Sequence, residues 1–197
     1  MFSSKRSRVR ALAVVGMAAV AAGVGTVTYQ ASAAEVAARP VPPAPAFSVP
    51  QIPDLIKPPA GSRPIGAYVV AVGSQNYTCV VAAGATTGAY TGASVPEAQL
   101  IGTGGRIHHF AGPSWQSLRD GSLVTATKVA ASPRTGAVPE LLLKVATHTG
   151  TGILSDADYI NRLATSGGVA PTGSCTSGQT VSVPYKAVYV FWDAPAA

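Results

Sequence analysis

A strictly alternating segment, residues 181–192, restricts the fold of this chain more than any other feature. Its odd positions are all apolar or aromatic: Val181, Val183, Tyr185, Ala187, Tyr189 and Phe191. The even positions between them are mixed in character, so a strand through this segment has one apolar face and one mixed face. Pro184 has no backbone N–H to donate, and it predicts an edge position or a β-bulge.

The rest of the chain beyond residue 61 shows almost no helical period. Runs of β-branched and aromatic residues recur between Gly, Pro, Ser and Thr. The predicted strands are residues 65–72, 75–81, 98–101, 107–111, 123–129, 141–147, 159–164 and 181–191. Gly73 and Ser74 predict a hairpin turn between the first two. About eight short strands without crossover helices predict one all-β domain, either an antiparallel β-sandwich or a β-barrel.

The first 33 residues have the three parts of a secretory signal peptide. Four cationic residues lie within the first ten positions, an apolar run extends from Ala11 to Val27, and small residues follow at Ala31, Ser32 and Ala33. An uncleaved membrane anchor is the alternative, but this Ala- and Gly-rich run is at the short limit for crossing ~30 Å of hydrocarbon. We therefore expect cleavage after Ala33, a secreted protein that is extracellular or associated with the cell envelope, and no remaining membrane span.

The positive charge of the chain belongs mostly to this signal. The formal net charge is +6, but cleavage after residue 33 leaves ten Lys and Arg residues against eight acidic residues. The remaining cations are scattered singly, whereas a phosphate-binding surface needs them clustered on one face. We therefore expect no nucleic-acid partner.

The organisation of the mature chain follows from its proline content. Eight prolines lie between residues 40 and 59, which favours extended backbone over a helix or a central strand. We predict a Pro-rich linker or arm over residues 34–60, the β-rich domain over residues 61–193 and a short tail over residues 194–197. Ile52, Leu55 and Ile56 are too apolar for a purely solvated linker, so we expect this part of the arm to pack on the domain.

Cys79 and Cys175 are the two cysteines of the chain. Export places them in an oxidising compartment, where thiols tend to pair, so a disulfide between them is expected. A nucleophilic thiol and a metal site are the alternatives.

A series of motifs runs through the mature domain: QNYTC at 75–79, HFAGPSW at 109–115, Pro139 with LLLK at 141–144, GTG at 150–152, YINR at 159–162, TSGGVAP at 165–171 and VPYKAVY at 183–189. Together they resemble an uncharacterised family of exported proteins, catalogued as domain of unknown function 3455, and the resemblance runs from about residue 61 to residue 192. The chain departs from the family at Glu140, where tryptophan is usual. Both cysteines match, which supports the disulfide. The resemblance implies export and the β fold, and it implies no reaction.

His109, Asp156 and Asp158 are the weak candidates for catalysis. Imidazole acts as a base or a ligand near neutral pH. Neighbouring residues of a strand point to opposite faces, so only one of His108 and His109 can face a pocket, and His109 is the one within the family motif. Asp156 and Asp158 lie on one side of an extended segment, as in a weak calcium site or a carboxylate pair. A hydrogen-bonded loop histidine and a polar turn are the structural alternatives, and we predict no metal site and no cofactor.

Trp115 and Arg162 are the binding candidates. A tryptophan after a Gly-Pro turn is either an aromatic platform for a ligand or a core residue. An arginine within an apolar strand needs a partner, because an isolated buried charge is costly. It either pairs structurally or recognises an anion.

These features favour a non-enzymatic binding or envelope-associated domain whose ligand is a glycan or a protein. The alternative is a secreted hydrolase or metal-dependent enzyme that uses His109 with Asp156 or Asp158. Whether the protein is an enzyme stays open at this point, with the absence of a convergent catalytic set favouring binding.

Overall fold

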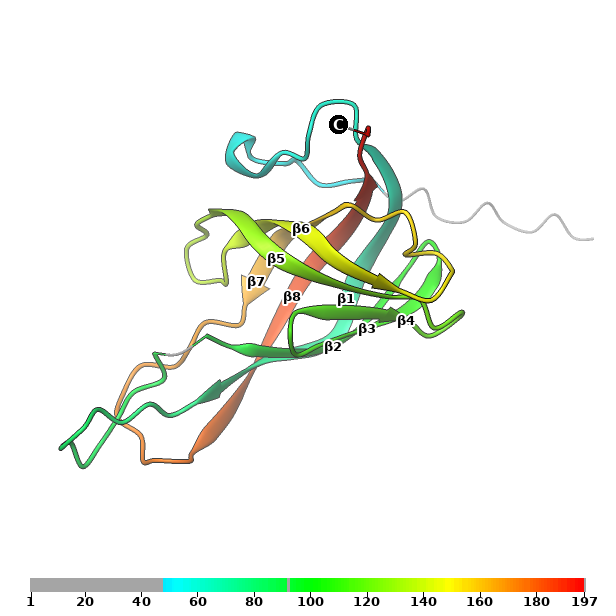
Figure 1. Ribbon diagram of the computed structural model, residues 1–197. Coiled ribbons are helices and arrows are strands. Elements are labelled where there is room, and N and C mark those ends of the chain that lie inside the picture. Colours follow the sequence, from blue (N-terminus) through cyan, green and yellow to red (C-terminus); the bar gives the residue numbers. More distant parts are fainter. Residues whose placement is uncertain (1–47, 92, 197) are drawn as a thin grey trace, which may run out of the picture. The chain divides into compact units, whose positions relative to one another are not determined.

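Eight antiparallel strands follow one another around a closed barrel in this computed structural model, which describes residues 48–91 and 93–196 (Figure 1). The strands are β1 Arg63–Thr78, β2 Val95–Gly102, β3 Gly105–Phe110, β4 Ser114–Ser117, β5 Leu123–Ser132, β6 Glu140–Thr149, β7 Tyr159–Gly167 and β8 Thr180–Asp193. The sequence left a sandwich and a barrel open, and the barrel is what forms, because β1 pairs with both β2 and β8. The predicted signal peptide and residues 34–47 of the predicted arm lie outside the described residues.

The first two predicted strands are one strand, so the predicted hairpin at Gly73 and Ser74 is wrong. β1 continues through both residues, and its register against β8 shifts between Val69 and Ser74. Gly73 sits where a Cβ would come 2.6 Å from the Cβ of Ala98. The glycine therefore permits a bend and a close approach within a long strand rather than a turn.

β4 was not predicted at all. It has only four residues, Ser114–Ser117, which is too short for an alternating pattern to stand out. Pro184 lies on no edge, because the barrel is closed, but it pairs with Ser74 at the register shift between β1 and β8. The sequence predicted an edge position or a β-bulge for this proline, and the β-bulge is correct.

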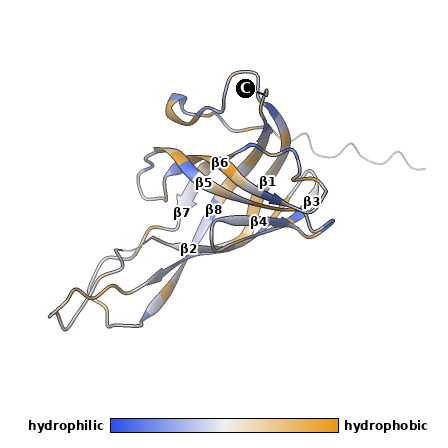
Figure 2. Ribbon diagram, viewed as in Figure 1, coloured by the Kyte–Doolittle hydropathy of each residue, from blue (hydrophilic) through white to orange (hydrophobic). Residues whose placement is uncertain are grey.

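Inward-facing side chains fill much of the barrel. Tyr185, Ala187, Tyr189 and Phe191 of β8 are all buried, as the alternation predicted. Figure 2 shows hydrophobic and hydrophilic segments in turn along the strands. Leu154 and Ala157, from the connection between β6 and β7, join the same core cluster. This connection therefore packs into the barrel end where β6 stops and β7 begins.

The arm packs on the outside of the barrel through Ile52 and Ile56, as expected, whereas Leu55 is exposed. It contains a single 3₁₀ turn, η1 Asp54–Ile56, in which Ile56 is fully buried. Ile56 packs in a second apolar cluster with Leu163, Val190 and Trp192. Asn161 lies within this cluster and donates a hydrogen bond to the carbonyl of Ile56. No helix within the described residues is long and apolar enough to cross a membrane.

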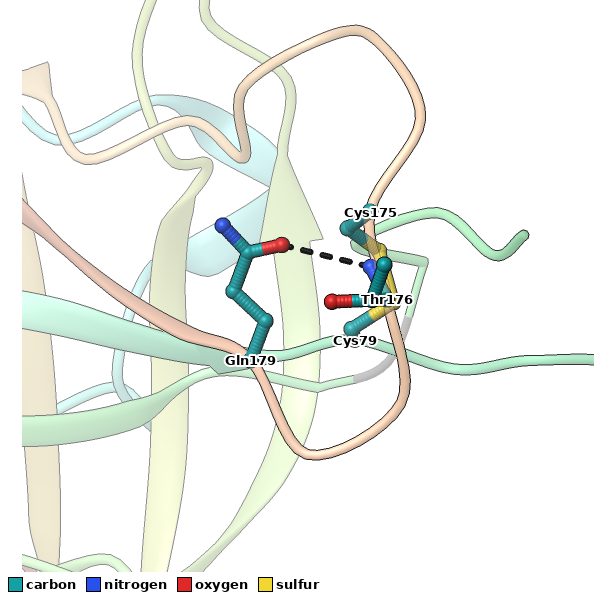
Figure 3. Close-up of a disulfide and its surroundings, with 4 residues drawn as sticks. All are labelled: Cys79, Cys175, Thr176 and Gln179. Atoms are coloured by element: carbon teal, nitrogen blue, oxygen red, sulfur yellow. Dashed lines mark hydrogen bonds between the residues drawn. A yellow bond between two sulfur atoms is a disulfide. The ribbon is translucent and has the colours of Figure 1, made fainter. Parts of the chain in front are cut away.

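Cys79 and Cys175 form a disulfide, as predicted, with their Cα atoms 5.9 Å apart (Figure 3). The bond joins the connection after β1 to the connection before β8, and both connections extend from the same end of the barrel (Figure 1). Isolated bridges between Val80 and Ala89 and between Gly88 and Cys175 extend this contact. Gln179 accepts a hydrogen bond from the backbone of Thr176 next to the disulfide (Figure 3).

Candidate functional site

A cavity of about 410 Å³ occupies the barrel end that carries the disulfide-linked connections. Its wall is formed by the last residues of β1 and β3, the first residues of β4 and β6, and inward-facing residues of β5, β7 and β8. Apolar side chains such as Leu141 and Leu143 make up most of the lining. The lining contains the cations Lys128 and Arg162, and no Asp or Glu.

Three of the five predicted catalytic and binding residues meet in this cavity: His109, Trp115 and Arg162. His109 and Trp115 are directly paired between β3 and β4, so their side chains lie on the same inner face. Arg162 comes from β7, where it pairs with Leu141 of β6. Residues far apart in the sequence therefore line one space.

His109 is a buried, neutral histidine. Its ring stacks on the indole of Trp115, and its Nδ1 lies 2.9 Å from the carbonyl oxygen of Ser114. A carbonyl only accepts hydrogen bonds, so Nδ1 carries the proton and Nε2 is left as an acceptor. Burial lowers the pKa of His109 to about 3, and the nearby charge of Arg162 acts in the same direction while the bond to Ser114 opposes it. A base this weak is a poor proton acceptor near neutral pH.

His108 points the other way. Its Nε2 lies 2.6 Å from a carboxylate oxygen of Glu97 on the partly exposed outer side of the barrel. The prediction that only one of the two histidines faces a pocket agrees with this arrangement.

Arg162 is half-buried and pairs with no carboxylate in the described part of the chain. Its Nε and one terminal nitrogen donate hydrogen bonds to the carbonyl oxygen of Pro139, at 3.1 and 2.8 Å. The hydroxyl of Tyr189 also lies within hydrogen-bonding reach of the guanidinium. The expectation that this arginine needs a partner is thus met by neutral groups only, so no negative charge neutralises the guanidinium beside the cavity.

Two tyrosines of β8 lie beside Arg162, and their hydroxyls are 3.3 Å apart. Burial raises the pKa of Tyr189 and of Tyr185, and the charge of Arg162 opposes that rise in both. Both phenols are therefore neutral at physiological pH. Tyr189 lines the cavity, and neither phenol supplies a charge that would neutralise the arginine.

Gln75 is an unpredicted polar residue of the site, and it is only 1% exposed. Its Oε1 accepts a hydrogen bond from Ser94, but its Nε2 has no acceptor among residues 48–91 and 93–196. The indole Nε1 of Trp115 is also buried and has no acceptor among these residues. Gly168 packs against the Gln75 side chain, and a Cβ there would lie 3.1 Å from Cγ of Gln75. Buried donors without acceptors are uncommon in proteins and call for an explanation.

The family model described as protein of unknown function (DUF3455) matches residues 103–193. The chain is similar to this family over those residues, which are slightly less than half of its length. The match includes β3 to β8, His109, Trp115, Arg162 and Cys175, whereas β1, β2 and Cys79 precede it. Neither the curated proteins nor the solved structures contain a significant match to the chain.

The two predicted aspartates lie outside the cavity. Asp156 and Asp158 belong to the connection between β6 and β7, and neither lines the cavity. Because successive strands run in opposite directions, this connection is at the other end of the barrel from the β5–β6 connection that borders the cavity. A side-chain oxygen of Asp158 accepts a hydrogen bond from the backbone of Ala194, and Asp156 is exposed. The structure therefore does not bring the aspartates to His109.

His148 is also separate from the cavity, with its Nε2 2.8 Å from the carbonyl oxygen of Ala157. Across the described ranges, no three His, Cys, Asp or Glu side chains are grouped so that they could hold a metal ion. The cavity is therefore mostly apolar, and its polar groups are hydrogen-bond donors, one neutral imidazole acceptor and two cations.

Glu140, which the sequence analysis singled out as a departure from the family pattern, is not among the residues that line the cavity. It is 6% exposed, its carboxylate forms an ion pair with Arg134 at 3.0 Å, and it accepts a hydrogen bond from the backbone N–H of Ala164 at 2.7 Å. Ala164 has a positive φ of 47° at the register shift of β7 against β8. Glu140 thus holds an irregular part of β7 two residues after Arg162.

The sequence analysis identified His109, Trp115 and Arg162 as site residues. It did not identify Gln75 or Lys128. The alternation of β8 placed Tyr185 and Tyr189 on the inner face, and this signal could have added them. Gln75 begins the motif QNYTC of the family resemblance, but the alternation of β1 is interrupted at Gly73, so its side chain was not assigned to the inner face. Lys128 reads from the sequence as one of many scattered surface cations.

Proposed function

We propose that this protein is an exported binding protein that holds a small molecule with an apolar body in the open end of its barrel. The observation that carries the proposal is the cavity of about 410 Å³ lined mostly by apolar side chains. Small-molecule sites have volumes of roughly 300–1,000 Å³ and are apolar with a few polar groups that fix orientation. Mouths of β-barrels are among their usual places.

The geometry of the cavity restricts the class of ligand that the sequence suggested, which was a glycan or a protein. A folded protein does not fit into such a volume, and an apolar lining matches a hydrocarbon or aromatic body better than a hydroxyl-rich sugar. Binding is favoured over catalysis because His109 is a weak base and has no carboxylate beside it. The alternative of a hydrolase using Asp156 or Asp158 has no support in the arrangement of these residues.

Fluorescence of the neutral dye 1-aminoanthracene, which rises when the dye leaves water, tests the proposal. We expect saturable binding to the exported, disulfide-bonded protein. Ala111→Trp, at the exposed rim of the cavity, should abolish it by filling the opening. Ala146→Trp, on the outer face of β6, is the matched control and should bind like the unaltered protein. No saturable signal, or unchanged binding by Ala111→Trp, would overturn the proposal.

Export is part of this proposal and rests on the three-part signal of residues 1–33 and on the disulfide between Cys79 and Cys175. Mass spectrometry of the N-terminus is the test. Protein recovered from outside the cytosol should begin at Ala34. Recovery of the chain solely inside the cytosol, still beginning at Met1, would contradict export.

A further inference from the structure

Two kinds of unsatisfied group face or border the cavity. One is the guanidinium of Arg162, which is bonded to the carbonyl of Pro139 and to no carboxylate among the described residues. The other is the buried amide nitrogen of Gln75, which has no acceptor there. Both groups are hydrogen-bond donors, so what the cavity lacks is an acceptor, and the charge of Arg162 favours an acceptor that is negative.

The two tyrosines of β8 lie between Arg162 and Gln75, and Tyr189 is the one that lines the cavity. Tyr185 lies close to the side chain of Gln75, Tyr189 lies close to Arg162, and the two hydroxyls are 3.3 Å apart. Neutral hydroxyls adapt as donors or acceptors. A row of polar groups therefore runs from the arginine to the amide while the remaining wall is mostly apolar.

We propose that the ligand carries a carboxylate at one end, which binds between the guanidinium of Arg162 and the side-chain amide of Gln75, with its apolar body against Trp115 and Leu143. This inference rests on the proposed function and names its ligand class. A planar carboxylate matches the fork of N–H groups that a guanidinium presents.

The charges of the lining agree with an anion. Lys128 at the rim adds a second positive charge, and the absence of Asp and Glu from the lining leaves nothing to repel a carboxylate. The neutral imidazole of His109 offers an acceptor at Nε2, which does not favour an anion directly beside it. The head group is therefore assigned to the side of the cavity formed by β7, β8 and β1, and the body to the stacked rings.

Decanoate and decan-1-ol share an apolar chain and differ in the head group, so they separate this inference from the proposed function. Each is used to displace 1-aminoanthracene from the unaltered protein. We expect both to bind, and decanoate to bind about tenfold to a hundredfold more tightly, since a charge-assisted hydrogen-bonded pair is lost with the alcohol. This comparison needs no variant and so does not depend on whether a variant folds.

Arg162→Gln should remove the preference for decanoate over decan-1-ol. Arg162→Lys keeps the charge without the fork and should retain part of the preference. Arg106→Gln is the matched control, because Arg106 is exposed on β3 and outside the cavity. Gln75→Leu should weaken decanoate binding several-fold, with melting curves confirming that each variant is folded.

The outcomes are distinct. If neither 1-aminoanthracene nor either decyl compound binds, the proposed function is wrong and the carboxylate inference with it. If the alcohol binds as tightly as decanoate, or Arg162→Gln keeps the full preference, the carboxylate inference is wrong while the binding function stands.

Discussion

The imidazole of His109 lies flat against the indole of Trp115, with ring centroids 4.3 Å apart and an interplanar angle of 5°. The edge of Tyr189 meets both rings, at centroid distances of 5.1 Å from His109 and 5.8 Å from Trp115. A histidine enclosed in this way loses most of its contact with water. Its protonation state is therefore coupled to whether the barrel is folded.

This coupling predicts a pH-dependent stability. Burial lowers the pKa of His109 from 6.5 to about 3 in the folded protein. Between these values the unfolded chain takes up a proton that the folded chain does not. The contribution of a neutral His109 is therefore complete above pH 6.5, and the free energy of unfolding falls as the pH is lowered toward about 3. The slope should approach about 1.4 kcal/mol per pH unit, as measured by urea denaturation between about pH 7 and pH 5.

His109→Phe identifies the residue responsible. Phenylalanine keeps an aromatic ring against Trp115 and does not titrate, so the slope between about pH 7 and pH 5 should flatten. His108→Gln alters the outward-facing neighbour and should keep the slope of the unaltered protein. An equal slope in His109→Phe and the unaltered protein would show that the buried histidine is not the source.

The disulfide should contribute strongly to stability. Cys79 and Cys175 are separated by 96 positions, and in the chain-entropy model a loop of this length stabilises the folded state by up to about 4–5 kcal/mol. We expect reduction, or the double substitution Cys79→Ser with Cys175→Ser, to lower the melting temperature by several degrees. Unchanged melting with and without reductant would mean that the crosslink adds nothing to the folded state.

Elements with a long, regular pattern were predictable from the sequence, and irregular ones were not. β8 was predicted because its inward residues, including Tyr189, alternate over its length. β1 was divided in two because Gly73 in a bent strand has the same local signature as a turn. The difference lies in contacts with Ala98 on β2, which local sequence does not encode.

The residues of the site were also predictable only in part. His109, Trp115 and Arg162 were found because their chemistry is unusual within an apolar strand or beside a turn. Their convergence depends on the order of strands around the barrel, which also sends Asp156 and Asp158 to the opposite end. Gln75 was missed as a site residue, although it begins the motif QNYTC, because the motif does not show that this amide is buried.

Asn161 should anchor the arm to the barrel. It is fully buried, donates hydrogen bonds to the carbonyls of Ile56 and Leu141 at 2.8 and 3.0 Å, and accepts one from the indole of Trp192 at 2.9 Å. Asn161→Ala leaves these buried partners unsatisfied, so the free energy of unfolding should fall by about 3 kcal/mol. Chemical denaturation measures this loss, with Ser166→Ala, at an exposed position of β7, as the control.

The same variant should release the arm locally. Thermolysin cleaves before large apolar residues, and Ile56 is protected by burial in the second cluster. Cleavage near Leu55 and Ile56 should therefore be faster in Asn161→Ala than in Ser166→Ala. Equal cleavage rates would show that the apolar contacts of Ile56 hold the arm without the asparagine.

Glu140 should hold the irregular segment of β7 in place. Its carboxylate is buried and accepts the N–H of Ala164, whereas the side chain of its partner Arg134 is 50% exposed. Removing the acceptor leaves a buried N–H unpaired, so Glu140→Ala should lower the free energy of unfolding by about 1–3 kcal/mol. Arg134→Ala removes the half-exposed end of the ion pair and keeps the acceptor of the Ala164 N–H, so it should cost less than Glu140→Ala. Chemical denaturation of both variants checks this order, and an equal or larger loss in Arg134→Ala would assign the stabilisation to the ion pair instead of the strand.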